Sequence, residues 1–249
     1  MRNIGFVCIG ILIAASFAQA DTIKINSFSS TTSATIFFDD GNGHSGMASD
    51  PLAQINVTYS GSAGTFTFNT FSIDLLHDLM AGQSYNVTVR NTLTVTNGVG
   101  FVNANQMAYV FQQFGLSDLS GNPDQAAAVQ TALWDLSLNN HTPTSFAMDA
   151  DGTYSSGDES IFKVDFNGNP DAAAIAALTN LYLTGAAGAQ NQNGWLDGGP
   201  AGQPNTGQSL LIPPSLLPTL QTPEPSTFTL LVVGMCCLGA ERFRRRLTR

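Results

Sequence analysis

The side chains that most often carry catalysis are few and scattered in this chain. Its histidines are His44, His77 and His141, and no two of them have the i, i+4 spacing of a helical metal site. The segment Gly43-His44-Ser45-Gly46-Met47 approaches the turn that presents a nucleophilic serine, but methionine replaces the last glycine of Gly-x-Ser-x-Gly. The sequence therefore predicts no catalytic residue, no cofactor and no enzymatic activity, and a secreted hydrolase is kept as an alternative.

Cysteine chemistry is confined to the two ends of the chain. Cys8 lies near the N-terminus, Cys236 and Cys237 lie near the C-terminus, and residues 21–222 contain no thiol. That stretch can form no disulfide, no cysteine metal site and no cysteine nucleophile. Its stability must come from a packed core, which about 200 residues permit.

Two segments together resemble a known family. The segment Phe71-Ser72-Ile73-Asp74 is followed, about fifty residues later, by Gln130-Thr131-Ala132-Leu133-Trp134 on a strongly predicted helix. Over about residues 60–140 the chain resembles the Cys-Gln thioester domains of bacterial surface proteins. In that family a cysteine condenses with a helical glutamine into an electrophilic thioester. The resemblance places Ser72 at the cysteine position and Gln130 at the glutamine position, so no thioester can form here.

Several roles stay open for Ser72 and Gln130. The two residues could hydrogen-bond to each other as an inert relic, or Gln130 could be satisfied by backbone groups while Ser72 faces solvent. A Ser72–Gln130 ester, which would make the chain a covalent adhesin, is a third possibility. The ester requires an adjacent base, because a serine hydroxyl ionises far less readily than a thiol. His77 is the nearest candidate along the chain.

Acidic turns over residues 149–171 offer oxygen atoms that would suit Ca²⁺. Asp149 and Asp151 precede Asp158 and Glu159, and a second group runs from Asp165 to Asp171. Neither group follows the EF-hand loop, and in the second group Pro170 stands where that loop requires glycine. We interpret both groups as ordinary acidic turns and assign no metal site.

The first twenty residues have the order of a secretory signal peptide. Arg2 supplies a positive charge, residues 4–17 are mostly apolar, and Ala18 and Ala20 are the small residues that a signal peptidase reads. Cleavage is expected before Asp21. The mature chain is therefore expected to function beyond the inner membrane.

The C-terminus carries a second ordered signal. Pro223-Glu224-Pro225 precedes an apolar stretch over residues 228–240, and a basic cluster of Arg242, Arg244, Arg245, Arg246 and Arg249 follows. Positive charge stays on the cytoplasmic side of a membrane. The last 28 or so residues resemble the PEP-CTERM sorting signal. The resemblance implies transient anchoring by a C-terminal transmembrane helix and processing by an exosortase, usually in bacteria that make an extracellular polysaccharide matrix.

Charge separates the mature chain from nucleic-acid-binding proteins. Residues 21–222 carry three Lys and Arg against sixteen Asp and Glu, a formal charge of −13. Binding to nucleic acid requires a basic surface, so this class is excluded. The acidity favours a well-solvated surface.

Periodicity predicts a mixed fold. Residues 35–38, 54–59, 65–70 and 85–95 have the composition or alternation of strands. Helices are predicted over residues 101–114, 123–138 and 171–183, the last ended by Gly185. We expect an α+β domain with an antiparallel, β-sandwich-like portion and two or three packed helices, in which Trp134 is a core residue.

These features predict four segments and one role. Residues 1–20 form the signal peptide, 21–200 the domain, 201–221 a Pro/Gly/Gln linker and 222–249 the sorting signal. The expected role is that of an exported, exosortase-processed surface or matrix-associated structural or adhesive protein. Its expected partners are signal peptidase, exosortase and extracellular polysaccharide.

Overall fold

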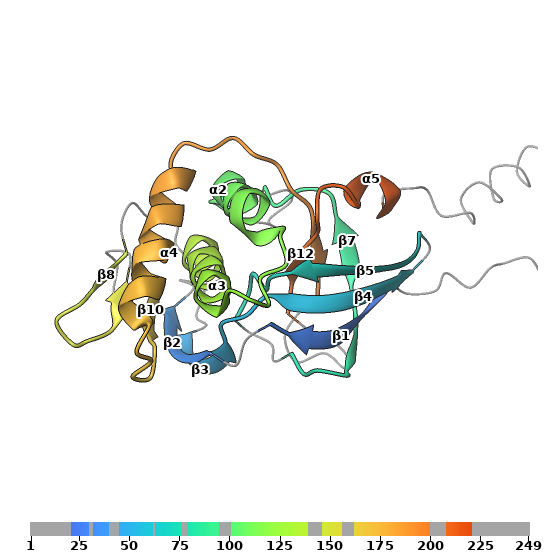
Figure 1. The fold of residues 1–249 in the computed structure, drawn as a ribbon. Coiled ribbons are helices and arrows are strands. Elements are labelled where there is room, and N and C mark those ends of the chain that lie inside the picture. Colours follow the sequence, from blue (N-terminus) through green and yellow to red (C-terminus); the bar gives the residue numbers. More distant parts are fainter. Residues whose placement is uncertain are drawn as a thin grey trace, which may run out of the picture.

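A computed structural model describes most of the chain between the two terminal signals (Figure 1). The described residues are 21–29, 32–39, 45–61, 63–75, 79–94, 101–138, 146–155, 162–199 and 208–220. The signal peptide and the sorting signal fall outside these ranges, so the expectations for them remain predictions. Within the ranges, no helix has the length and apolar character needed to cross a bilayer.

Three antiparallel sheets form the β-structure. The first sheet has the order β5-β4-β1-β6, the second β3-β2-β10-β9-β8 and the third β12-β11-β7. The strands of the first sheet are β1 (Thr22–Phe28), β4 (Ile55–Gly61), β5 (Gly64–Thr70) and β6 (Ser84–Asn86). Those of the second are β2 (Ser33–Asp39), β3 (Ser45–Pro51), β8 (Ala147–Met148), β9 (Tyr154–Ser155) and β10 (Phe162–Asp165). Those of the third are β7 (Thr88–Arg90), β11 (Trp195–Asp197) and β12 (Leu210–Leu211).

Most of the helices gather on one side of the molecule, over the second sheet (Figure 1). They are α2 (Ala104–Val110), which continues as the π-helical turn η2 (Phe111–Gly115), α3 (Pro123–Leu138) and α4 (Ala172–Ala186). The short α5 (Leu217–Leu220) lies apart from them, beside the third sheet. Every residue of α3 from Ala126 to Leu136 is buried. Its alanines let the neighbouring helices approach closely, and the Thr179 hydroxyl of α4 donates to the Ala128 carbonyl at 3.4 Å.

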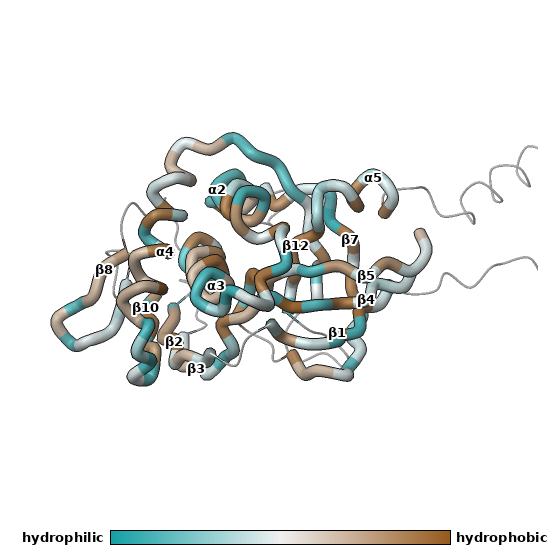
Figure 2. Tube along the Cα trace, in the orientation of Figure 1, coloured by the Kyte–Doolittle hydropathy of each residue, from teal (hydrophilic) through white to brown (hydrophobic). Residues whose placement is uncertain are grey.

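Two hydrophobic cores follow from the strand alternation. On β4, Ile55, Val57 and Tyr59 are buried, and polar residues alternate with them (Figure 2). Their inward face joins β1 to residues of the third sheet, including Leu196 and Leu210, in one core. The other core lies between α2, α3, α4 and the second sheet, and it includes Ile36, Val164 and Trp134. Trp134 is 1 % exposed, so its expected role as a core residue is confirmed.

The expected fold class is confirmed at the level of an α+β fold with antiparallel sheets, and the helix over 123–138 is confirmed to the residue. The single strand expected over 85–95 is wrong, because it is divided at Val87. Strand β6 pairs with β1, whereas β7 pairs with β11, so the chain changes sheets at this buried valine. The last long helix also runs past Gly185 to Ala186.

The linker expected over residues 201–221 is wrong for residues 208–220. Strand β12 pairs with β11, and Leu210, Leu211 and Ile212 are fully buried. The prolines that suggested an extended spacer lie beside this strand and in α5. The fold therefore extends to Leu220.

Candidate functional site

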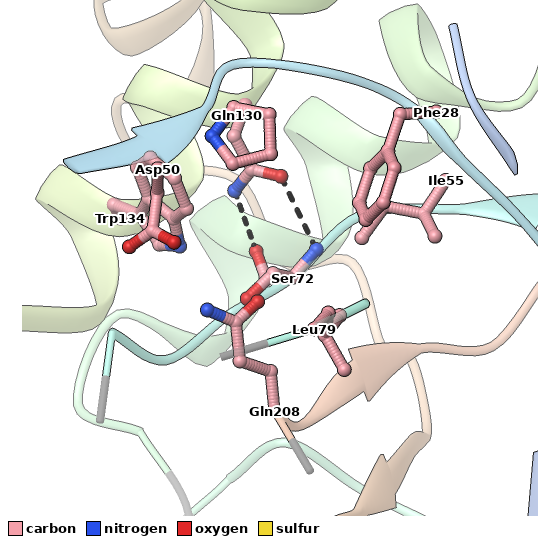
Figure 3. Close-up of a pocket in the computed structure, with 9 residues that line it drawn as sticks. Phe28, Asp50, Ile55, Ser72, Leu79, Gln130, Trp134 and Gln208 are labelled. Carbon is pink, nitrogen blue, oxygen red and sulfur yellow. Dashed lines mark hydrogen bonds between the residues drawn. The ribbon is translucent and has the colours of Figure 1, made fainter. Parts of the chain in front are cut away.

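Ser72 and Gln130 lie side by side in the structure (Figure 3). The Gln130 carboxamide forms two hydrogen bonds with the backbone of Ser72. Its Nε2 donates to the Ser72 carbonyl at 2.8 Å, and its Oε1 accepts the Ser72 N–H at 3.2 Å. Both residues are 1 % exposed. The two motifs that the resemblance to thioester domains singled out therefore meet in the fold.

Strand pairing explains why the backbone of Ser72 is available to a side chain. Ser72 forms an isolated antiparallel bridge with Leu210. The hydrogen bonds of this bridge are made by the residues on either side, Ile73 N–H to the Ser209 carbonyl at 2.9 Å and Leu211 N–H to the Phe71 carbonyl at 3.1 Å. In such a pair, the N–H and C=O of the central residue point away from the partner strand. They point toward α3, where the carboxamide of Gln130 occupies the place of a further strand.

The hydroxyl of Ser72 points elsewhere. Its Oγ donates to the carbonyl oxygen of Asp74 at 2.9 Å. The relic hypothesis expected a hydrogen bond between Ser72 and Gln130, and such bonds are present. Gln130 bonds to the main chain of Ser72, however, and not to its hydroxyl. Gln130 is satisfied by backbone groups, as the second hypothesis stated, whereas the solvent-facing Ser72 of that hypothesis is wrong because the residue is buried.

A small hollow lies beside the pair, with room for about one water molecule. Its lining includes Asp50, Leu79, Trp134 and Gln208 (Figure 3). The indole Nε1 of Trp134 is buried without a hydrogen-bond partner among the described residues. A site of this size admits no substrate chain.

Asp151 and Asp165 in the acidic turns accept hydrogen bonds from nearby residues of the chain. Asp151 accepts hydrogen bonds from the N–H and the Oγ1 hydroxyl of Thr153, at 3.1 and 2.6 Å. It also forms an ion pair with Lys163 at 2.6 Å. These contacts hold the pKa of Asp151 well below its usual range. Asp165 accepts from Asn167 N–H at 2.8 Å. Across the described ranges, no three His, Cys, Asp or Glu side chains are placed to share a metal ion.

Several residues named from the sequence fall outside the described ranges. They are His44, His77, His141, Asp158 and Glu159, the cleavage residues Ala18 and Ala20, the sorting motif Pro223, Glu224 and Pro225, and Arg242, Arg244, Arg245 and Arg246. The expectation that His77 could act as a base stays a prediction.

Sequence reasoning missed a groove beside the ends of β1, β4 and β5 in the first sheet. It has a volume of about 330 Å³, and its lining includes Phe28, Gln54, Asn56, Asn69 and Asp118. The strand predicted over residues 54–59 includes Asn56, but the sequence suggested no binding role for this residue. The loop that brings Asp118 to the groove follows η2 and gave no signal of its own.

The comparisons with known proteins add no relative. No family model, no curated protein and no solved structure matches the chain.

Proposed function

We propose that this chain is an exported surface or matrix-associated protein without catalytic activity, in which the Ser72–Gln130 pair is a structural element. The observation that carries the proposal is the double hydrogen bond between the Gln130 carboxamide and the Ser72 main chain. A carboxamide used in this way remains an intact amide. The hydroxyl that would have to attack it is directed at the Asp74 carbonyl.

Export and sorting are proposed on the order of residues at the two ends of the chain. An N-terminal signal with Ala18 and Ala20 and a C-terminal Pro223-Glu224-Pro225 motif with an arginine-rich end support an exported, exosortase-processed product. The formal charge of −13 over residues 21–222 suits a protein solvated outside the cell.

Localisation tests the sorting half of the proposal. In cells with an active exosortase, the tail beyond Pro223-Glu224-Pro225 should be removed and the product should leave the membrane fraction. In cells without the enzyme, or with all three motif residues changed to alanine, the uncut chain should stay in the membrane. An uncut chain in the cytosol of exosortase-positive cells would refute the proposal.

A Ser72–Gln130 ester is the second candidate, and the adjacency of the two residues is the observation in its favour. Forming the ester would join Ser72 Oγ to the Gln130 side-chain carbonyl carbon and release one ammonia. Intact mass spectrometry of the purified full chain separates the two candidates. The structural role predicts that the wild type and Ser72→Ala, after signal removal, each have the mass calculated from their own sequence. A wild-type mass one ammonia below its calculated value, with Ser72→Ala at its own calculated value, would establish the ester instead.

A further inference from the structure

The outer face of the first sheet is polar over its whole described extent. Strand alternation turns Ile23, Ile25, Val57 and Tyr59 inward, where they are buried. The residues that alternate with them carry hydroxyl or amide groups, with one lysine among them. This polar face consists of Thr22, Lys24, Asn26, Asn56, Thr58, Ser60, Thr65, Thr67, Asn69, Ser84 and Asn86.

Hydrogen bonds between side chains fix the orientation of the central amides. Asn26 Nδ2 donates to Asn56 Oδ1 at 2.8 Å and to Thr58 Oγ1 at 3.0 Å. Asn56 Nδ2 in turn donates to Asn69 Oδ1 at 2.7 Å, and the hydroxyls of Thr58 and Thr67 are 3.0 Å apart. Side chains that are ordered before binding lose less conformational entropy when a ligand arrives.

The polar face leads into the groove of about 330 Å³, because Asn56 and Asn69 belong to both. This volume lies within the usual range of small-ligand sites. Phe28 also lines the groove, but its pairing with the buried Ile55 turns its ring to the inner core. At the far side, Asp118 accepts the Ser120 N–H at 3.0 Å, and this hydrogen bond lowers the pKa of Asp118, so its carboxylate is an ionised acceptor.

The base of the groove is rigid. Gln54 is 2 % exposed, and its Nε2 donates to the carbonyls of Gly115 and Ser117 at 2.9 and 2.7 Å. Its Oε1 accepts the N–H of Leu119 at 3.0 Å. The loop that carries Asp118 is thereby tied to β4, and the groove is formed before any ligand binds.

The chemistry of this surface selects a class of ligand. Fixed amides and hydroxyls can donate to and accept from the hydroxyls of a sugar chain, and the Asp118 carboxylate can accept from them. Lys24 is the one cation on the polar face, and the −13 charge of residues 21–222 repels polyanions. We propose that the polar face and the groove bind a neutral polysaccharide chain. This inference rests on the proposed location outside the cell and names the matrix component that the protein would contact.

The test uses the full chain in mild detergent and three neutral polymers, dextran, laminarin and mannan, with alginate as an anionic comparison. Affinity electrophoresis measures retardation in gels that contain each polymer. At least one neutral polymer should retard the wild type more than alginate does. The double variant Asn56→Ala/Asn69→Ala should bind at least fivefold more weakly. Asn105→Ala is the matched control, since Asn105 of α2 also bonds to neighbouring amides, those of Gln190 and Gln192, away from the groove.

A second variant keeps the test informative if the double variant fails to fold. Ser120→Arg places a long side chain at the mouth of the groove from an exposed loop position, so it should weaken binding while the chain still unfolds cooperatively. Absence of retardation by all three neutral polymers would overturn the inference. Retardation that both variants leave intact, or stronger retardation by alginate, would overturn it too. The proposed function would survive each of these results, since it is tested by the localisation and mass experiments.

Discussion

At the scale of single residues, Gln130 acts as a substitute for a strand. It supplies one donor and one acceptor to Ser72, whose backbone on the other side faces β12. Gln130→Ala should leave a buried N–H and a buried C=O without partners. An unsatisfied buried group costs about 1–3 kcal/mol, so we expect a loss of roughly 2–6 kcal/mol in the free energy of unfolding. Urea denaturation measures it, with Gln113→Ala as the control at an exposed glutamine. Equal losses in the two variants would contradict this role.

The near-isosteric change Gln130→Glu makes the same contact sensitive to pH. A carboxylate can still accept the Ser72 N–H, but it faces the Ser72 carbonyl without a proton to donate. Burial and this repulsion should raise the pKa of the introduced carboxyl above the unfolded value of about 4.3. The folded state then binds more protons than the unfolded state, so the variant should be stable at acid pH and lose stability as the pH rises through the folded pKa. A melting temperature that falls in parallel with the wild type between pH 7 and 4 would count against the contact.

At the scale of elements, the end of η2 packs so closely against aromatic rings that position 115 has room only for glycine. A Cβ on Gly115 would lie 2.9 Å from Phe111 Cδ2 and 3.2 Å from Phe71 Cε2. Gly115→Ala should therefore cost about 1–3 kcal/mol through overpacking. Gly121→Ala is the matched control, because a Cβ there meets nothing within 4 Å. Thermal unfolding of both variants tests the difference. A Gly115→Ala protein as stable as Gly121→Ala would show that the two rings can move apart freely.

The beginnings of α3 and α4 place two acidic groups near each other. Burial raises the pKa of Asp124, and the negative charge of Asp171 adds to the effect. The ionised form is therefore disfavoured in the fold, and this cost is present at neutral pH and disappears as the pH falls toward about 3.9. Asp124→Asn should raise the melting temperature at pH 7 by an amount on the order of 1 °C, and the gain should vanish near pH 4.

Asp118→Asn should change the melting temperature in the opposite direction from Asp124→Asn. Hydrogen bonds from Ser120 lower the pKa of Asp118, so its carboxylate stabilises the fold above about pH 3.9 and loses this effect as the pH falls through the folded pKa. The asparagine variant should melt slightly below the wild type at pH 7. The same direction of change in both variants would contradict the assignment of these charges.

The elements that the sequence predicted well are those with local signals. Helix α3 has Asn122 and Pro123 at its start and a continuous apolar pattern, and the structure reproduces its bounds. Strands such as β4 were found because apolar residues alternate within them. Strand β3 was missed, because Ser45, Gly46 and Asp50 give it no such alternation and pairing with β2 alone defines it. The contact between Ser72 and Gln130 followed from the motifs, but its main-chain character depends on Leu210, far along the chain.

At the scale of the whole molecule, the segment 70–73 joins the two cores. Phe71 and Ile73 belong to the core beneath the helices, whereas Leu210, which bridges Ser72, belongs to the core between the first and third sheets. Leu211 returns to the helical core. The Thr70 hydroxyl also donates to the Leu211 carbonyl, at 2.5 Å. Residues 208–212 are thus the last part of the chain needed to bring the two cores together.

Truncation tests this dependence. Removing everything after residue 207 deletes the fully buried Leu210, Leu211 and Ile212. Burial of each such side chain contributes about 1.5–3 kcal/mol, so the loss of roughly 5–9 kcal/mol approaches the whole stability of a typical domain, about 5–15 kcal/mol. A chain that stops after residue 207 should show no cooperative unfolding transition by circular dichroism. A chain that stops after residue 221 keeps β12 and α5 and should melt as the full chain does. If the shorter chain melted cooperatively as well, the two cores would be independent of β12, and residues beyond 207 would be the spacer that their prolines suggested.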